Sequence, residues 1–189
     1  MVSRIFFLGL VLLVAAERLA ELARSRRNRR RALARGGHEV GRAHYPWMVG
    51  VHAAFLVAAP LEVFLLRRPF VLALAAPMVT LLALAMALRY WAIAALGERW
   101  NTRIVVVPGE PAIVGGPYRL VRHPNYLAVV VEMFALPLVH TAWLTALVFS
   151  AANAVLLAVR VRSEERALAA AGDYRSRLGD RPRFLPGAF

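Results

Sequence analysis

Two clusters of polar side chains carry the residue types that could do chemistry in this sequence. The first is GGPYRLVRHPNY, residues 115–126, and the second is RVRSEERALAAAGDY, residues 160–174. The first offers arginines, an imidazole and aromatic rings, and the second offers two adjacent carboxylates beside further arginines. Arginine side chains and helix N–H groups bind carboxylates, and carboxylates bind ammonium groups. Together the clusters could hold a zwitterion such as an amino acid.

The position of the first cluster depends on a helix that begins beside it. Pro124 suits the first turn of a helix, where its missing N–H costs nothing, so we expect a helix from about His123. If this helix and the next form a hairpin, His123 and Tyr126 lie close to Arg160 and Glu164. Two plainer interpretations remain: an interfacial belt of aromatic and basic residues, and solvated i,i+4 pairs such as Arg160–Glu164.

The chain is typical of an all-α integral membrane protein. It is 60% hydrophobic, with a mean hydropathy of +0.56, which is too apolar for a soluble domain of this length. Apolar segments predict five transmembrane helices, at residues 3–23, 46–66, 70–95, 124–139 and 141–160. We expect the first to be a retained signal anchor. The chain then forms a single domain, 1–189, with a three-helix part (1–96) and a second part (97–189) containing a loop, a helical hairpin and a C-terminal segment.

The charge distribution predicts the orientation. The formal net charge is +13, and all 24 basic residues are arginines. They gather in segments 24–42, 97–123 and 160–183, which favours an outside N-terminus and a cytoplasmic C-terminus. The run from Arg24 to Arg35 is expected to be a helical extension lying on anionic lipid, unless it only sets topology. This grouping between apolar runs, without a recognisable nucleic-acid-binding fold, argues against nucleic acid as a partner.

Other segments have features beyond membrane spanning. The β-branched run Ile104–Val107, flanked by turn signals, predicts a structured cytoplasmic loop. The tail 179–189 is rich in proline and aromatic residues and is expected to fold back onto the interface. Within the spans, Glu132 lies in the fourth segment and Asn153 in the adjacent one, and a carboxylate is costly to bury there. Either Glu132 is protonated and only hydrogen-bonded to a neighbour, or it faces a substrate cavity, which we favour; Glu62 has the same status. With no cysteine and five scattered histidines, the sequence predicts no metal site.

Taken together, the two clusters resemble a known family. GPYRLVRHPNY followed by a helix, and then RVRSEERAL and GDY, is similar to the isoprenylcysteine carboxyl methyltransferase family over residues 97–178. More narrowly, ALGERWNTRIVVVPG and HPNYLAVVVE resemble the branch found beside bacterial type III polyketide synthases, whose members O-methylate alkylpyrones and alkylresorcinols. This narrower match is carried by five positions: Trp100, Asn101, Thr102, Asn125 and Glu132.

The resemblance implies a membrane-embedded methyltransferase that uses S-adenosylmethionine without a Rossmann fold. It implies that the cofactor is held between the last two helices and the C-terminal segment, on the cytoplasmic face of a bacterial inner membrane. The implied cofactor residues are Tyr118, Arg122, His123, Pro124 and Tyr126 on one side and Arg160, Glu164 and Glu165 on the other. The implied catalytic residues are Glu132, Asn153 and Asn101, with Glu132 as a base or an orienting hydrogen-bond acceptor. The family's usual Phe-Gly before the tyrosine is Ala171-Gly172 here.

The acceptor is expected to be a lipid-like small molecule that enters from the bilayer, while the cofactor enters from the cytoplasm. The leading expectation is O-methylation of an alkylpyrone or alkylresorcinol hydroxyl. The alternatives are carboxyl methylation of a prenylated cysteine or another lipid acid, a membrane reductase that uses NADPH, and a non-catalytic scaffold for anionic lipid or a partner. The residues predict no particular oligomeric state.

Overall fold

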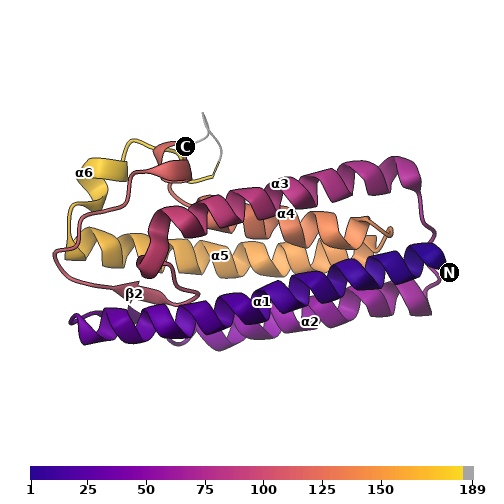
Figure 1. Ribbon diagram of the computed structural model, residues 1–189, viewed down its shortest axis with the longest axis horizontal. Coiled ribbons are helices and arrows are strands. Elements are labelled where there is room, and N and C mark those ends of the chain that lie inside the picture. The colour runs from indigo at the N-terminus through magenta and orange to yellow at the C-terminus, as the bar shows by residue number, and fades with distance from the viewer. Residues whose placement is uncertain (185–189) are drawn as a thin grey trace.

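The computed structural model describes residues 1–184, and most of them are helical (Figure 1). The long helices run roughly along one axis, with the N-terminus at the end opposite α6. In chain order the elements are α1 (Val2–Ala34), β1 (His38–Val40), α2 (Tyr45–Leu65), α3 (Leu72–Leu96), the 3₁₀ helix η1 (Gly97–Arg99), β2 (Ile104–Val106), the 3₁₀ helix η2 (Gly116–Arg119), α4 (Pro124–Leu138), α5 (Trp143–Ala171) and α6 (Tyr174–Leu178).

Each apolar segment of the sequence forms a helix, but the helices differ in how well they suit a bilayer. Within residues 1–184, three are long and apolar enough to cross a membrane: α2, α3 with the turn that follows it, and α5. The α4 helix is apolar but has only 15 residues, and the apolar part of α1 carries Arg4, Glu17 and Arg18. The helical membrane class is therefore supported, while five spans stay a prediction.

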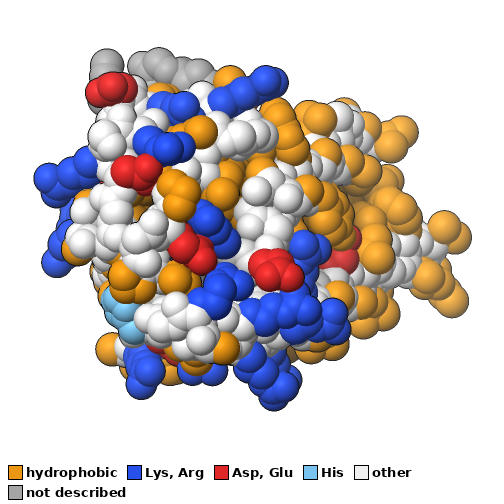
Figure 2. Space-filling model, turned by 60° about the vertical axis from the view of Figure 1, so that its left-hand side comes forward, with side chains coloured by type: hydrophobic (Ala, Val, Ile, Leu, Met, Phe, Trp, Pro, Cys, Tyr) orange, Lys and Arg blue, Asp and Glu red, His pale blue; other side chains and the backbone are white. Residues whose placement is uncertain are grey.

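The apolar core lies between the membrane helices. Phe7, Phe55 and Met133, from α1, α2 and α4, are almost fully buried within it. Outside the core, large apolar side chains face outward, such as Leu147 (65% exposed) and Val155 (69% exposed) on α5. Exposed apolar surface of this kind is stable only against lipid or a partner. Figure 2 shows the same division, with apolar side chains along the helices and arginines gathered at one end.

A two-stranded antiparallel sheet adds to the predicted all-α fold. β1 pairs with β2 so that Glu39 lies opposite Val105, which means that the β-branched run becomes a strand. The Glu39 side chain is 1% exposed and accepts hydrogen bonds from Arg29 (2.9 Å) and from Arg103. The Arg29 contact fastens the sheet to the C-terminal part of α1, and the Arg103 contact joins β1 to the residue before β2.

The arginine-rich segment continues α1 without a break, which confirms the predicted helical extension. One face of the extension packs on the loop after α3: Asn28 Nδ2 donates to the Trp100 carbonyl (2.8 Å) and to the Gly97 carbonyl (3.2 Å). The Ser25 and Thr102 hydroxyls are 2.9 Å apart, and the Thr102 N–H also donates to Ser25 Oγ (2.9 Å). The extension therefore supports the loop, and its contact with lipid stays a prediction.

Glu62 has a structural role at the opposite end of the molecule from this loop. Its carboxylate accepts hydrogen bonds from the Leu144 N–H (3.2 Å) and from the N–H and hydroxyl of Thr145 (both 2.7 Å). Arg68 Nε donates to the same carboxylate (2.8 Å). Because the first N–H groups of a helix have no partner within it, Glu62 on α2 acts as the cap of α5. These contacts account for a carboxylate buried within an apolar helix, and they require no substrate cavity beside it.

Replacing Glu62 with alanine should therefore destabilise the protein. We expect the free energy of unfolding to fall by about 1–3 kcal/mol, because the N–H groups at the start of α5 lose their acceptor. Thermal unfolding in detergent, followed by circular dichroism, measures the loss. Thr80→Ala is the matched control, because the Thr80 hydroxyl is exposed and bonds only to the Ala76 carbonyl of its own helix. Equal melting temperatures for both variants would contradict the capping role.

Candidate functional site

A cavity lies at the end of the molecule that carries the sheet and α6. Its walls come from the end of α1, the loop after α3, the start of α4 and the end of α5 with α6. The lining residues are 96, 99–101, 105–107, 110–113, 118, 122, 123, 125, 126, 164, 168, 171–174 and 178, together with Ala32 and Arg35 of α1. Segments from both halves of the sequence therefore form a single site.

Tyr126 is the centre of the polar contacts beside this cavity. Its hydroxyl donates a hydrogen bond to Glu164 on α5 and accepts one from Arg160 Nε (2.7 Å). The His123 ring stacks on the Tyr126 ring, with centroids 5.3 Å apart and planes 18° from parallel. These contacts confirm that the start of α4 lies beside the part of α5 that contains Arg160 and Glu164.

Glu165 forms a second contact between the same helix ends. His123 Nε2 and Arg122 Nη1 lie 3.1 Å and 3.2 Å from its carboxylate, and Arg183 Nη2 donates to it at 2.8 Å. Arg183 belongs to the tail, which folds back over the start of α4: the Arg122 N–H donates to the Pro182 carbonyl (2.9 Å) and the His123 N–H to the Arg183 carbonyl (3.0 Å). The tail therefore folds back, up to residue 184, onto the start of α4; its contact with the membrane interface stays a prediction, and residues 185–189 lie outside the described part.

Hydrogen bonds across the cavity join the end of α5, and the residues just after it, to the loop between β2 and η2. The Ala112 N–H donates to Asp173 Oδ1 (2.7 Å), and the Gly109 N–H donates to the Ala171 carbonyl (3.0 Å). The Ala112 N–H, with Arg177, holds the pKa of the Asp173 carboxyl below its usual value. A side chain at Gly172 would place its Cβ 3.3 Å from the Glu110 carbonyl oxygen. Ala171-Gly172 therefore lets the chain pass close to the loop.

Aromatic side chains make up much of the inner wall. Trp100, Tyr118, Tyr126 and Tyr174 all line the cavity and are at most 9% exposed. Burial raises the pKa of the Tyr118 and Tyr174 hydroxyls above the ordinary tyrosine value, so both stay neutral. Faces of neutral aromatic rings attract cations. The wall is therefore suited to a ligand with a positively charged group.

Four buried polar atoms of lining residues lack a hydrogen-bond partner among residues 1–184. They are the side-chain oxygens of Asn101 and Asn125, the hydroxyl of Tyr174 and Nε of Arg122. Buried polar groups are normally paired, so these atoms indicate that the cavity receives a polar ligand. The family resemblance implied a catalytic role for Asn101, whereas Asp173 and Tyr174 belonged to the second polar cluster of the sequence without a predicted role of their own.

The structure groups most of the sequence-predicted site residues, but not all. Six line the cavity: Asn101, Tyr118, Arg122, His123, Tyr126 and Glu164. Arg160 and Glu165 bind lining residues from outside the wall, and Pro124 is buried at the first turn of α4. Glu132 and Asn153 are 3% and 2% exposed but lie outside the lining. Glu132 follows the cavity residues of α4, and Asn153 precedes those of α5.

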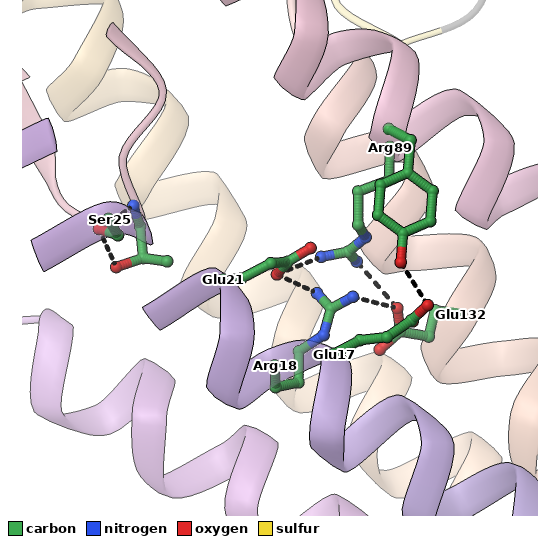
Figure 3. Close-up of polar contacts among 8 residues, drawn as sticks. Glu17, Arg18, Glu21, Ser25, Arg89 and Glu132 are labelled. Atoms are coloured by element: carbon green, nitrogen blue, oxygen red, sulfur yellow. Dashed lines mark hydrogen bonds and ion pairs between the residues drawn. The ribbon is translucent and has the colours of Figure 1, made fainter. Parts of the chain in front are cut away.

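Glu132 is part of a second cluster, which we name the charged square (Figure 3). In this square Arg89 Nη2 is 2.9 Å from Glu132, and Arg18 Nη1 is 2.9 Å from Glu21. The remaining sides are longer: Arg89 to Glu21 is 3.4 Å and Arg18 to Glu132 is 3.5 Å. The square joins α1, α3 and α4.

Fold and cavity together define a helical membrane protein with a cavity lined by polar and aromatic side chains at one end. A family model described as the isoprenylcysteine carboxyl methyltransferase (ICMT) family matches residues 78–170. An uncharacterized Bacillus subtilis protein, YpbQ, is 38% identical over 162 residues, which cover 84% of this chain and 94% of the relative. An uncharacterized Haemophilus influenzae protein is 30% identical over 156 residues, covering 82% and 90%. The chain belongs to the ICMT family, which implies a membrane methyltransferase.

The support of the cavity by α1 can be tested at Asn28. Asn28→Ala removes the donor to two loop carbonyls, so the loop should open locally more often. Each buried carbonyl left unpaired costs about 1–3 kcal/mol. We expect hydrogen exchange across residues 97–107 to rise by tenfold or more, while exchange in α2 stays as in the wild type. Unchanged exchange in the loop would show that α1 does not hold it.

Proposed function

We propose that this protein is an S-adenosylmethionine-dependent O-methyltransferase that acts on a lipidic acceptor, the hydroxyl of an alkylpyrone- or alkylresorcinol-type polyketide. The observation that carries the proposal is the cavity beside Tyr126 and Glu164. The ICMT family match supports methyl transfer. The similarity of residues 95–109 and 123–132 to the polyketide-associated branch supports the choice of acceptor.

The residues present are suited to S-adenosylmethionine. Glu164, one of three carboxylates that line the cavity with Glu110 and Asp173, would bind its ammonium group, and Arg122 would bind its carboxylate. The unpaired atoms of Asn101, Asn125 and Tyr174 would hydrogen-bond to its nucleoside. The aromatic wall would face its sulfonium. The donors and acceptors of this cavity thus match the polar groups of the cofactor.

The chemistry demands positioning more than acid–base catalysis. S-adenosylmethionine supplies a methyl group on a positively charged sulfur, and the electron pair of the broken bond stays on sulfur. The protein must align the acceptor oxygen with that methyl and exclude water. An acidic enol loses its proton to solvent without a strong base, whereas a phenol needs more help. Because Glu132 is already paired with Arg89 (2.9 Å), it is better suited to orienting the acceptor than to removing a proton.

Membrane placement follows from the two ligands. The water-soluble cofactor enters from the cytoplasm, and the acceptor's tail enters from lipid between the helices. The arginine-rich end of Figure 2 then faces the cytoplasm, with the N-terminus outside and five spans. The chain has no cysteine, so labelling of single cysteines placed at Arg27 and Arg67 tests this orientation against a clean background.

Carboxyl methylation of a prenylated cysteine or another lipid acid is the second candidate. The name of the family favours it. A carboxylate acceptor needs no base, which is consistent with the paired state of Glu132. Methylation assays with a prenylcysteine and with an alkylpyrone, run side by side, separate the two substrates.

Cofactor binding is the first test of the proposal. Purified protein in detergent should bind S-adenosylmethionine saturably and should not bind NADPH. Glu164→Gln should raise the dissociation constant at least about tenfold, because a hydrogen bond between charged groups contributes about 1.5–3 kcal/mol. Glu98→Gln is the matched control: Glu98 pairs with Arg31 on the surface and is not part of the lining.

Three results would contradict the proposal. The first is binding of NADPH in place of S-adenosylmethionine, which favours a reductase. The second is binding of neither, which favours the non-catalytic scaffold. The third is equal loss of affinity in Glu164→Gln and Glu98→Gln, which would show that the affinity does not depend on the cavity.

A further inference from the structure

The charged square has an unusual composition for a site within membrane helices. It combines two guanidinium groups with two carboxylates, so its formal charge is zero. The Arg89 and Glu132 side chains are 2% and 3% exposed, and those of Arg18 and Glu21 are 15% and 10% exposed. Burying four charges is costly even when they are paired. Fastening α1 to α3 and α4 could be achieved by apolar contacts, so the charges call for a further explanation.

The pairing in the square is also incomplete. Among residues 1–184, Arg89 Nε, Arg18 Nε and Glu21 Oε1 are buried without a hydrogen-bond partner, and Arg18 Nη2 has only the 3.5 Å ion pair with Glu132. Both arginines keep their charge in a protein and can only donate. At bilayer depth, unpaired donors cost several kcal/mol each. The square therefore has two Nε–H donors, one on each arginine, available for an oxygen from outside the chain.

Polar groups continue from the square in two directions. Toward lipid, the half-exposed Tyr90 hydroxyl donates to Glu17, one helical turn before Glu21 (Figure 3). Toward the cavity, Tyr126 precedes Glu132 by six residues on α4, and its hydroxyl accepts a hydrogen bond from Arg160 Nε (2.7 Å). The square thus lies between the lipid and the Tyr126–Arg160 contact.

We propose that Arg18 and Arg89 bind an oxygen of the acceptor's polar ring, which makes the charged square the acceptor-recognition site. This inference rests on the proposed methyl transfer. The class of acceptor it selects is a lipid whose head is a six-membered ring with two separated oxygens. One oxygen accepts hydrogen bonds from the guanidinium groups, and the other is the methyl acceptor beside the cavity.

The spacing along α4 favours such a ring over a carboxylate. Glu132 lies six residues after Tyr126, which is about 9 Å along a helix at 1.5 Å per residue. A carboxylate has both oxygens on one carbon, so it cannot contact the square and also approach the methyl group. A ring with a carbonyl and an enol oxygen in conjugation spans more of this distance. Hydrogen bonds to its carbonyl oxygen also stabilise the enolate that reacts.

Direct binding measurements test the inference separately from turnover. Two acceptors with the same alkyl tail are titrated in detergent by calorimetry: a 4-hydroxy-6-alkyl-2-pyrone, with two oxygens available, and a 3-alkylphenol, with one. The wild type should bind the pyrone at least about tenfold more tightly, because hydrogen bonds to charged donors contribute that much. Arg89→Lys keeps a cation beside Glu132 but loses the planar fork with its Nε donor, so it should reduce the preference below about threefold.

Matched variants separate binding from folding. Arg18→Gln, at the more exposed corner of the square, should reduce the same preference and serves if Arg89→Lys does not fold. Tyr90→Phe removes a hydrogen bond at the same level of the bundle but outside the square, so it should keep the wild-type preference. A purely structural square would weaken the binding of both acceptors equally.

The outcomes distinguish the two proposals. A wild type that binds the phenol as tightly as the pyrone, or an Arg89→Lys variant that keeps the full preference, overturns the acceptor site. Selective pyrone binding that depends on Arg18 and Arg89, without methyl transfer from S-adenosylmethionine, supports this site and overturns the proposed function instead.

Discussion

The structure depends most on the Tyr126 hydroxyl, which is shared between the Glu164 carboxylate and the Arg160 guanidinium. Arg160 also donates through Nη2 to the Thr102 carbonyl (2.6 Å), so one group of contacts joins α4, α5 and the loop after α3. Loss of any member leaves a buried charge or donor unpaired, which costs more than the bond itself contributes. These contacts hold together three of the walls of the cavity.

The sequence predicted best those features that depend on residues close together in the chain. Pro124 predicted the start of α4, and a hairpin of two adjacent apolar segments then predicted that Tyr126 and Glu164 meet. The support from α1 could not be predicted in this way. Asn28 bonds to carbonyls about seventy residues away, and neither periodicity nor a motif indicates which loop a helix face will contact. For the same reason, the strand partner of residues 104–106 was not predicted.

Two membrane carboxylates show why burial of a charge alone does not define its role. Glu62 and Glu132 give the same signal in the sequence, an acidic residue within an apolar segment. In the structure Glu62 accepts bonds from the start of α5, whereas Glu132 pairs with Arg89 and Arg18. The difference depends on how α1, α3 and α4 are rotated about their axes, which the apolar pattern does not fix.

The central claim is that a single ligand contacts the inner ends of α4 and α5 together. A crystal or cryo-electron microscopy structure with S-adenosylhomocysteine, the product that remains after methyl transfer, tests it most directly. We predict that its amino-acid portion contacts Glu164 of α5 and the Arg122–Tyr126 segment that begins α4, with the ring system near Asn101 and Tyr174. A bound ligand that contacts only one of the two helices, or that lies outside this cavity, would contradict the account.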